Sequence, residues 1–506
     1  MDIDFTSSIL LLSFIILLAK IIKVARQSSG VSNLPPGPRK LPVIGNLHQL
    51  VAGFQLPHQT LSDLARKYGP MMHLQLGEVI TVVISSPDAA QEIMKTHDVA
   101  FANRPSLLAP EILFYKNTDI VFSPYSEYWR QLRKICTIEL LSAKRVQSYK
   151  TLREGEVSKL CQWIASKEGS VIELSEKVSL NTCDIVMQAS LGYNTTELAE
   201  FTLIVEETVE LMAGMTLGDF FPSIKLIGLI TGIKRRAERL HKHSDRILGN
   251  IIDECKATKD EPKLRENLVD VLVKLNDEGH ELHLTIENIK SVLRDMFTAG
   301  IETSSTTVNW AMTEMLKHPK ILKNAQNELR MVFKDKGHVD EADFDKLKYL
   351  KLVIKETLRL HPPAPLLAPR ENSEQCKIHG YNIPAKTRVM VNVWSMGRDP
   401  KYWDDAESFV PERFLDNPVD FKGSNFEYLP FGAGRRICPG MSFGLANVEL
   451  PLAMFLYHFD WLLPDGMKPE DLAMEETFGI TTKRKDPLHV IPKLMNPCPV
   501  RDGLVV

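Results

Sequence analysis

The sequence predicts a mainly α-helical protein with a small β portion, preceded by a single transmembrane helix. Apolar residues recur at helical spacing over most of the chain, above all through residues 142–276 and in one long stretch from Thr285 to Lys317. Alternating apolar residues are confined to a few short segments, and an apolar run stands near the N-terminus. Helical segments therefore outweigh strands heavily.

The apolar run near the N-terminus predicts a membrane anchor over residues 1–26. Its core, FTSSILLLSFIILLAKIIKV at residues 5–24, approaches the ~20 residues that span a bilayer. Lys20, Lys23 and Arg26 lie at the end of the run or just after it, so the positive-inside rule leaves the rest of the chain in the cytosol. A cleaved signal peptide is the alternative, but its positive charge normally precedes the apolar run.

Proline density predicts a stiff extended linker and hinge over residues 27–42. Leu34-Pro-Pro-Gly-Pro38 cannot form a helix, and such a segment would hold the following body at a set angle to the membrane. No further linker divides residues 43–506, which we therefore expect to form one catalytic domain.

Local spacing places the regular elements of this domain. Thr285 is the expected N-cap of the longest helix, and Pro319 stops it after Lys317, a length on the order of 50 Å. Two further helices are expected over 61–67 and 87–96. Short strands are expected at these positions: 72–76, 81–85, 389–393 and 488–491.

Charge and cysteine content argue against two classes of protein. The net charge is −3 with 25% charged residues, so no nucleic-acid partner is expected. The seven cysteines are scattered and form no Cys-x-x-Cys pair. This pattern indicates free thiols in a reducing compartment and not a disulfide framework.

One cysteine lies in an unusual loop, Phe431-Gly-Ala-Gly-Arg-Arg-Ile-Cys438-Pro-Gly440. The neighbouring arginines favour the thiolate, and the glycines let the loop turn tightly and approach a flat partner closely. Zinc takes about four ligands and none cluster here, whereas haem iron takes a single protein ligand. The alternative is a surface loop with an idle cysteine.

The loop resembles the Phe-x-x-Gly-x-Arg-x-Cys-x-Gly signature of the cytochrome P450 family, the haem-thiolate monooxygenases, through Phe431, Gly434, Arg436, Cys438 and Gly440. The resemblance covers nearly the whole chain. It implies the cytochrome P450 fold, with the long central helix over the haem. It also implies haem b with its iron on the Cys438 thiolate, O2, and electrons from NADPH through the membrane-bound NADPH–cytochrome P450 reductase.

The resemblance also assigns roles on the central helix, where Ala299-Gly-Ile-Glu-Thr303 matches the family's Ala/Gly-Gly-x-Asp/Glu-Thr motif. Gly300 leaves room for oxygen near the iron, and Glu302 relays protons. Thr303 bonds a backbone carbonyl and holds the water that delivers the protons. Glycine, an acid and hydroxyls pack poorly in a helix interior, and such local rule-breaking marks functional sites. Taken alone, the string also fits an N-cap or a solvated polar face.

Donors to the haem propionates are implied at four positions. Trp129 and Arg133 match the family's Trp-x-x-x-Arg and share one helical face at i, i+4 spacing. Arg436 has the same role by its place in the cysteine loop, because guanidinium groups suit carboxylates. Arg370 is a further donor, although it fits a surface arginine in a turn equally well.

A second pair of motifs implies a structural lock. Glu356 and Arg359 form Glu-x-x-Arg on a helix, and the resemblance joins them to Arg413 of Pro411-Glu-Arg-Phe414. Pairs at i, i+3 are common on helix surfaces and are then worth little. Apolar neighbours on both sides favour burial here, so we expect the lock to support the fold and the haem loop.

The segments that the family uses for substrate contact are mostly apolar here, which favours a small hydrophobic substrate. Core packing is the ordinary alternative for each of these residues taken singly. The candidate pocket residues are Leu113, Leu211, Met215, Ala299, Leu366, Leu367 and Phe478.

The chain as a whole is similar to plant enzymes of specialised metabolism, and within that group to terpene hydroxylases. This similarity implies a hydroxylase or oxidase of a sesqui- or diterpene on the endoplasmic reticulum membrane, with its catalytic domain in the cytosol. An alkaloid or phenylpropanoid substrate is the alternative. A cationic alkaloid would often meet a carboxylate in the pocket, and acidic residues lie in candidate pocket segments: Glu111, Asp219, Glu475 and Glu476.

Two other classes of haem protein compete with a monooxygenase. A haem-thiolate isomerase or dehydratase typically alters the acid–threonine pair or the cysteine loop, and both are intact here. A non-catalytic haem carrier or sensor needs no proton relay.

Overall fold

The computed structural model describes residues 33–51, 55–192, 196–212, 214–258, 266–277, 284–477 and 479–498. The expected anchor over residues 1–26 and the start of the linker lie outside these ranges. Among the helices of the described residues, none has both the length and the apolarity to cross a membrane.

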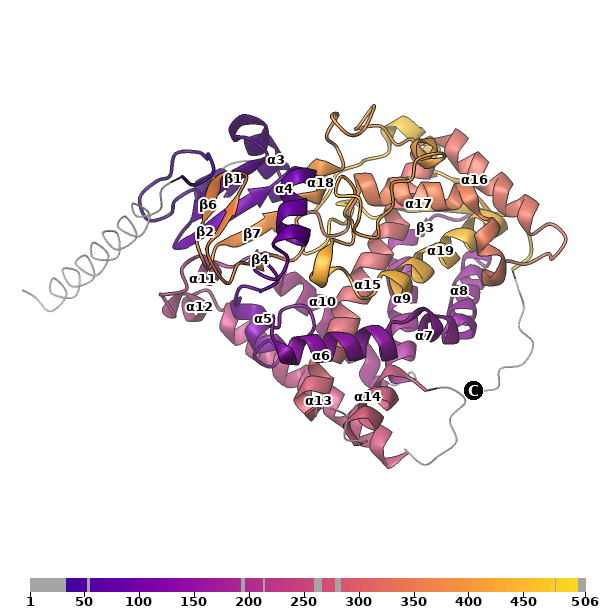
Figure 1. Cartoon of the computed structure of the whole chain (residues 1–506). Coiled ribbons are helices and arrows are strands. Elements are labelled where there is room, and N and C mark those ends of the chain that lie inside the picture. The colour runs from indigo at the N-terminus through magenta and orange to yellow at the C-terminus, as the bar shows by residue number, and fades with distance from the viewer. Residues whose placement is uncertain are drawn as a thin grey trace, which may run out of the picture.

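The molecule has a large helical part and a small sheet-rich part at one side (Figure 1). The predicted class, mainly α with a small β portion, is thus confirmed. The helices are α2 (Leu47–Val51), α3 (Pro57–Tyr68), α4 (Pro87–Gln91), α5 (Leu108–Leu113), α6 (Glu127–Ile135), α7 (Ala143–Ser148), α8 (Lys150–Ala165), α9 (Leu174–Leu191), α10 (Thr196–Leu211), α11 (Leu217–Phe220), α12 (Leu226–Ile230), α13 (Ile233–Ala257), α14 (Leu268–Asp277), α15 (Ile286–Lys317), α16 (Pro319–Val332), α17 (Lys348–Leu360), α18 (Val393–Met396) and α19 (Met441–His458). The strands are β1 (Met71–Leu76), β2 (Val79–Ile84), β3 (Ile172–Glu173), β4 (Arg370–Glu371), β5 (Cys376–Ile378), β6 (Tyr381–Ile383), β7 (Arg388–Val391), β8 (Phe459–Leu462) and β9 (His489–Leu494).

The main sheet joins two strands of residues 71–84 to two strands of residues 370–391. Its strand order is β1-β2-β7-β4, and β2 pairs in parallel with β7, with Val82 opposite Val389. The strands expected at 72–76 and 81–85 are present and pair with each other as β1 and β2, with Gly77 at φ +61° in the turn. Strands β3, β4, β5, β6 and β8 were not predicted. They hold two to four residues each, too few for a period to show.

The central helix α15 has the predicted bounds. The Thr285 hydroxyl accepts a hydrogen bond from the Asn288 N–H, and the Asn288 side chain accepts from the Thr285 N–H. This reciprocal pair caps the helix and fixes where it begins. The helix packs against α9, α10, α17 and α19, so it crosses the helical part between its main layers (Figure 1).

The proline-rich segment forms no helix over residues 34–40, and it does not stand free of the domain. The Pro36 carbonyl accepts a hydrogen bond of 2.8 Å from the His73 N–H in β1. The Asn46 side chain donates to the Pro38 carbonyl at 3.2 Å. A Cβ at Gly37 would lie 2.0 Å from the His73 carbonyl oxygen, so only glycine allows this approach. The segment therefore docks along β1.

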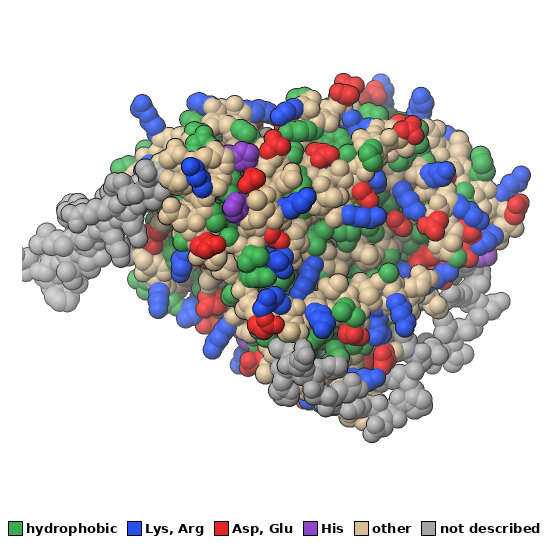
Figure 2. All heavy atoms as spheres, viewed as in Figure 1, with side chains coloured by type: hydrophobic (Ala, Val, Ile, Leu, Met, Phe, Trp, Pro, Cys, Tyr) green, Lys and Arg blue, Asp and Glu red, His purple; other side chains and the backbone are tan. Residues whose placement is uncertain are grey.

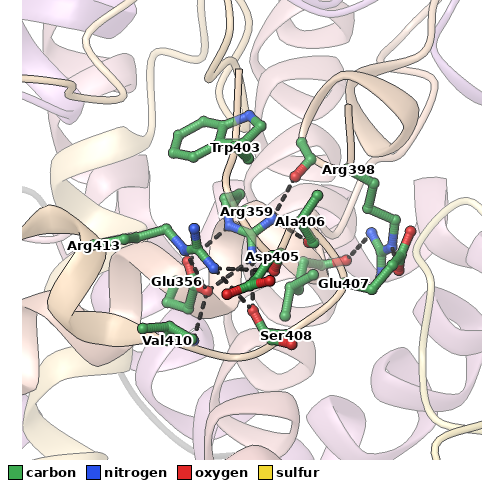
Figure 3. A network of polar contacts seen from close by, with 12 residues as sticks. Glu356, Arg359, Arg398, Trp403, Asp405, Ala406, Glu407, Ser408, Val410 and Arg413 are labelled. Atoms are coloured by element: carbon green, nitrogen blue, oxygen red, sulfur yellow. Dashed lines mark hydrogen bonds and ion pairs between the residues drawn. The ribbon is translucent and has the colours of Figure 1, made fainter. Parts of the chain in front are cut away.

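The expected Glu356–Arg359 pair lies in the protein interior (Figure 3). Both side chains are 0% exposed and form two hydrogen bonds of 2.7 Å. Arg413 donates to the same carboxylate at 3.0 Å, and Arg359 also donates to the carbonyls of Ala406 and Ser408. Every charge in the network is therefore paired, which a buried ion pair requires. The network ties α17 to the segment that leads to the cysteine loop.

A second polar cluster, buried except for His318, alternates two glutamates with three histidines. Glu314 lies 2.7 Å from His361 and 3.4 Å from His318, and Glu476 lies 2.8 Å from His58 and 3.6 Å from His361. These residues come from α3, from the end of α15 and the residue that follows it, from the residue after α17, and from the loop before β9. The cluster thus joins four distant parts of the chain.

We expect Glu314→Gln to destabilise the protein most between about pH 4.5 and 6.5. Burial alone would raise the pKa of Glu314, but hydrogen bonds from His318 and His361 outweigh it and lower that pKa to about 2. The ionised Glu314 side chain therefore contributes on the order of 3 kcal/mol to the free energy of unfolding. This contribution is fully present above the pKa that Glu314 has in the unfolded chain, and it is lost as pH falls towards 2. The hydrogen bond to Glu314 raises the pKa of His318, so that contribution is lost as pH rises through the folded value.

The measurement is chemical unfolding of the wild type and the variant at acidic, mildly acidic and mildly alkaline pH. The matched control is Glu92→Gln, which removes the carboxylate of the half-exposed Glu92–His97 pair. We expect that control to change the free energy of unfolding by less than about 1 kcal/mol at every pH. If Glu314→Gln lowers the free energy of unfolding by the same amount at every pH, the electrostatic explanation is contradicted.

Candidate active site

The cysteine loop lies between the structural lock and α19, and glycine controls its path. The Cys438 N–H donates to the Phe431 carbonyl at 2.9 Å, which closes the loop on itself. Gly434 has φ +68°, and a Cβ there would lie 2.2 Å from the Met94 carbonyl oxygen and 2.7 Å from Asp98 Oδ1. Only glycine fits at this contact. The loop is thereby pressed against the segment that follows α4, and Cys438 is held at the wall of a cavity.

The Cys438 thiol lies partly buried at the cavity wall, and its surroundings act on its pKa in opposite directions. Burial raises its pKa, while the Gly440 N–H and the charge of Arg133 on α6 lower it by less. The positive charge that favours the thiolate therefore comes from Arg133 on α6. A bound metal cation would supply the missing stabilisation, since a coordinating thiol is deprotonated outright.

The facing wall of the cavity is the middle of α15. Ala299, Gly300 and Thr303 all line it. The Thr303 hydroxyl donates to the Ala299 carbonyl at 2.8 Å, the backbone hydrogen bond expected of it. A Cβ at Gly300 would only reach ordinary contact with Val186 at 3.5 Å, so the space beside Gly300 is open. Cys438 and Thr303 thus lie in the walls of one cavity.

Glu302 lies on another side of the same helix. Its carboxylate is 2.6 Å from Lys483 Nζ and 3.4 Å from the Thr481 hydroxyl. It lines a separate polar cavity, together with Glu206 and Asn309, that lies between α9, α10 and α15. The Glu302 side chain is only 5% exposed, whereas that of Lys483 is 47% exposed. The pair therefore connects the interior of the helix to solvent.

Four arginines line one part of the Cys438 cavity, three of them buried and Arg133 half-buried: Arg104, Arg133, Arg370 and Arg436. Burial lowers the pKa of Arg104 well below its usual range, and the charges of Arg436 and Arg370 lower it further. Burial and Arg370 likewise lower the pKa of Arg436, to about 9. Cations that disfavour one another in this way would be stabilised by an anionic ligand between them.

Trp129 is placed differently from the other expected donors. It does not line the cavity, and its indole N–H donates to the Ile120 carbonyl at 2.9 Å. The Arg436 guanidinium lies 4.0 Å from the centre of its ring. In this structure Trp129 therefore supports Arg436 through a cation–π contact, and its role as a propionate donor stays a prediction.

The structure places two of the seven candidate pocket residues in the cavity wall. Ala299 and Leu367 lie in the cavity wall, and Leu367 adopts a left-handed backbone at φ +52°, which is unusual for leucine. Phe478 lies outside the described residues. The remaining candidates pack in the core away from the wall, where core packing explains their apolar character: Leu113, Leu211, Met215 and Leu366.

Two charged residues in the cavity wall were missed in the sequence. Arg104 belongs to no motif, and nothing local distinguishes it. Asp295 had a signal: with Ala299, Thr303 and Thr307 it follows an i, i+4 series that places all four on one face of α15, and all four line the cavity. The acidic residues that we singled out do not line it: Glu111, Asp219, Glu475 and Glu476.

The cavity residues fit a haem. One half-buried thiol can supply a single metal ligand, and the cluster of guanidinium groups matches two carboxylates on one edge of a ligand. Most of the other wall residues are apolar, among them Leu358, Phe431 and Phe443. A flat, apolar group with two acidic substituents and a metal that takes one thiolate meets each of these features.

The chain is similar to known proteins over most of its length. The family model "Cytochrome P450" matches residues 35–489. Salviol synthase from Salvia pomifera is 52% identical over 99% of this chain and 100% of its own length. Desmethyl-deoxy-podophyllotoxin synthase from Sinopodophyllum hexandrum is 54% identical over 95% of this chain and 96% of its own. Premnaspirodiene oxygenase from Hyoscyamus muticus is 51% identical over 96% of this chain and 97% of its own length. A zebrafish cytochrome P450 solved with progesterone has a TM-score of 0.75 and 25% identity, and covers 87% of this chain and 100% of its own.

Proposed function

The chain belongs to the cytochrome P450 family of monooxygenases, which are oxidoreductases, and we propose that it inserts one oxygen atom from O2 into a sesqui- or diterpene. One observation carries the proposal: the loop of Cys438 and the Gly300–Thr303 segment of α15 form the walls of a single, mostly apolar cavity. The names of two relatives, salviol synthase and premnaspirodiene oxygenase, support a terpenoid substrate. The third relative's name refers to a different product, which keeps a phenylpropanoid as the alternative.

The residues of the cavity wall and of the polar cavity behind α15 each have a definite part in this chemistry. When bound, the haem supplies the iron that activates O2, with Cys438 as its ligand and the arginine cluster on its propionates. Thr303 holds a proton donor at the cavity, and Glu302 passes protons to it from the polar cavity behind the helix. The apolar wall excludes bulk water and orients a hydrophobic substrate.

We expect Glu302→Gln to lower product formation by about a hundredfold or more, because an amide cannot carry a proton. Haem content and substrate binding should stay unchanged, since Glu302 does not line the Cys438 cavity. The measurement is product formed per minute by membranes with equal haem content. The matched control is Glu176→Gln, which alters another carboxylate at the polar cavity, one that pairs with Lys177. Wild-type turnover in Glu302→Gln would rule out the relay.

Electrons, in this proposal, come from NADPH through NADPH–cytochrome P450 reductase. The cysteine-loop side carries exposed basic residues that a negatively charged partner could contact: Arg130, Lys134, Lys144 and Arg435. Figure 2 shows Lys and Arg side chains over α6 among acidic ones. We place the enzyme on the endoplasmic reticulum membrane through residues 1–26, with its catalytic domain in the cytosol.

The test is turnover of a substrate panel by membranes that contain this chain and a plant NADPH reductase. The panel holds mono-, sesqui- and diterpenes, alkaloids and phenylpropanoids, with products identified by mass. A terpene that gains one oxygen only with NADPH and O2 supports the proposal. Reaction of alkaloids or phenylpropanoids alone would leave a monooxygenase and remove the terpenoid assignment. Turnover without O2 or NADPH would instead indicate an isomerase or dehydratase.

A further inference from the structure

A turn of unusual backbone conformation follows α5 and leads into the wall of the Cys438 cavity. Tyr115, Lys116 and Asn117 have φ angles of +49°, +61° and +59°. The left-handed region is sterically unfavourable for residues other than glycine. A run of three such residues occurs once in the described part of the chain. Contacts with the rest of the protein must therefore hold this turn in place.

Polar groups at the end of the turn add to the cost of its conformation. Asn117 Oδ1 and Thr118 Oγ1 are buried, and among the described residues no hydrogen-bond partner reaches either atom. Water would satisfy both atoms if the turn moved outwards. The strained backbone and the unsatisfied oxygens thus both favour release of the turn.

Tyr115 fastens the turn to two neighbouring helices. Its hydroxyl donates a hydrogen bond of 2.7 Å to Asp245 Oδ1 on α13, and its ring lies edge-on to His241, with 4.6 Å between the ring centres. The ammonium group of Lys290 on α15 lies 2.7 Å from the same Asp245 oxygen. Hydrogen bonds to an ionised acceptor are stronger than those between neutral groups. The Tyr115 hydroxyl therefore acts against the strain of the turn.

The chain on each side of the turn is anchored separately. The Phe114 carbonyl accepts a hydrogen bond of 3.2 Å from Ser291 on α15. The Thr118 carbonyl accepts one of 2.7 Å from the Tyr128 hydroxyl on α6. These anchors hold the two ends of the turn and leave residues 115–117 as the segment that can move.

The turn lies at one edge of the Cys438 cavity. Ile120, which follows it closely, lines the cavity together with Met296 on α15. Lys290, which holds the turn through Asp245, lies six residues before Met296, about 9 Å along the helix axis. Movement of the turn away from α13 and α15 would therefore open the cavity at this edge.

We propose that residues 115–117 form a strained lid at this edge of the cavity, that the Tyr115–Asp245 hydrogen bond holds it shut, and that ligands enter and leave when it opens. The strain keeps the closed and open states close in free energy, so that a minor open state is populated. Rates of entry and exit then scale with that population. The closed lid excludes water and retains the ligand. The proposal holds for any ligand of the cavity and does not depend on the identity of the substrate.

The test follows the binding of clotrimazole to the purified holoenzyme by stopped flow. This bulky apolar azole ligates haem iron and changes its absorbance, so no turnover is required. We expect Tyr115→Phe to raise the association and dissociation rate constants alike by about tenfold, the factor that one hydrogen bond to a charged group supplies. The dissociation constant should not change, because the closed state is destabilised equally with and without ligand.

The matched control is Tyr349→Phe, which removes a tyrosine–carboxylate hydrogen bond of the same length, 2.7 Å, to Glu412. Neither residue of that pair lines the cavity. Both rate constants of this variant should equal those of the wild type. Haem content confirms that each variant is folded.

A second series changes the backbone strain at Lys116, whose side chain is exposed. Glycine adopts the left-handed conformation without steric cost, whereas a β-branched residue is poorly tolerated there. We therefore expect Lys116→Gly to slow both rate constants about threefold and Lys116→Ile to speed both about tenfold.

Three results would overturn the lid. The first is wild-type exchange of clotrimazole in Tyr115→Phe. The second is a change confined to the dissociation rate constant, which would indicate a lost contact with the ligand. The third is equal exchange in Lys116→Gly and Lys116→Ile. Because each readout is a binding rate, the lid can fail while the proposed oxygenation stands, and the reverse.

Discussion

Replacing Cys438 with serine is expected to reduce NADPH-dependent oxygen insertion to the background of membranes that lack the protein. The thiolate is a soft ligand that donates electron density to the iron and favours O–O cleavage, and a neutral hydroxyl does neither. The change removes little volume, and the loop is held by its own hydrogen bond and by Gly434, so the chain should still fold. The measurements are product formation and the red-shifted absorbance band of the reduced, CO-bound protein.

The matched control for this substitution is Cys498→Ser. Cys498 is a half-buried free thiol that packs against the core near Cys161, away from the cavity. The Cys498→Ser variant should keep both the absorbance band and full activity. C–H hydroxylation retained in Cys438→Ser would contradict the assignment of the metal ligand, whatever the state of the absorbance band.

Arg359→Ala is expected to cost about 3–5 kcal/mol of folding free energy, because it leaves the Glu356 carboxylate charged and buried. That loss is a large part of the ~5–15 kcal/mol by which most domains are stable. The substitution also removes the donor to the carbonyls of Ala406 and Ser408 (Figure 3). We therefore expect little soluble, haem-loaded protein at physiological temperature, and a strongly lowered unfolding midpoint in what remains.

The chain offers a control of identical spacing on its surface. Arg66 and Asp63 also form an i, i+3 pair, at 3.0 Å, but their side chains are 69% and 48% exposed. Arg66→Ala should change the free energy of unfolding by no more than about 1 kcal/mol, since solvent already screens the pair. Similar losses in the two variants would show that burial does not decide the strength of the Glu356–Arg359 pair.

Local features of the sequence predicted most of the helical framework. The bounds of α15 follow from a cap formed by residues three apart and from a proline just past its end, and both act within one helical turn. The hairpin of β1 and β2 likewise depends on adjacent residues. The short strands were missed because pairing with distant strands, and not local preference, makes them strands.

What the sequence by itself determined is therefore the family, the single thiol ligand and the helix that faces it. Each of these depends on residues close together in the sequence, whose relative positions follow from backbone geometry alone. The tertiary structure alone decided which side chains share the cavity. Arg104, Arg133, Arg370 and Arg436 come from four separate segments, and Asp295 meets a loop 175 residues away. Burial and charge at such a site depend on what packs around it, so they follow from the fold and not from spacing.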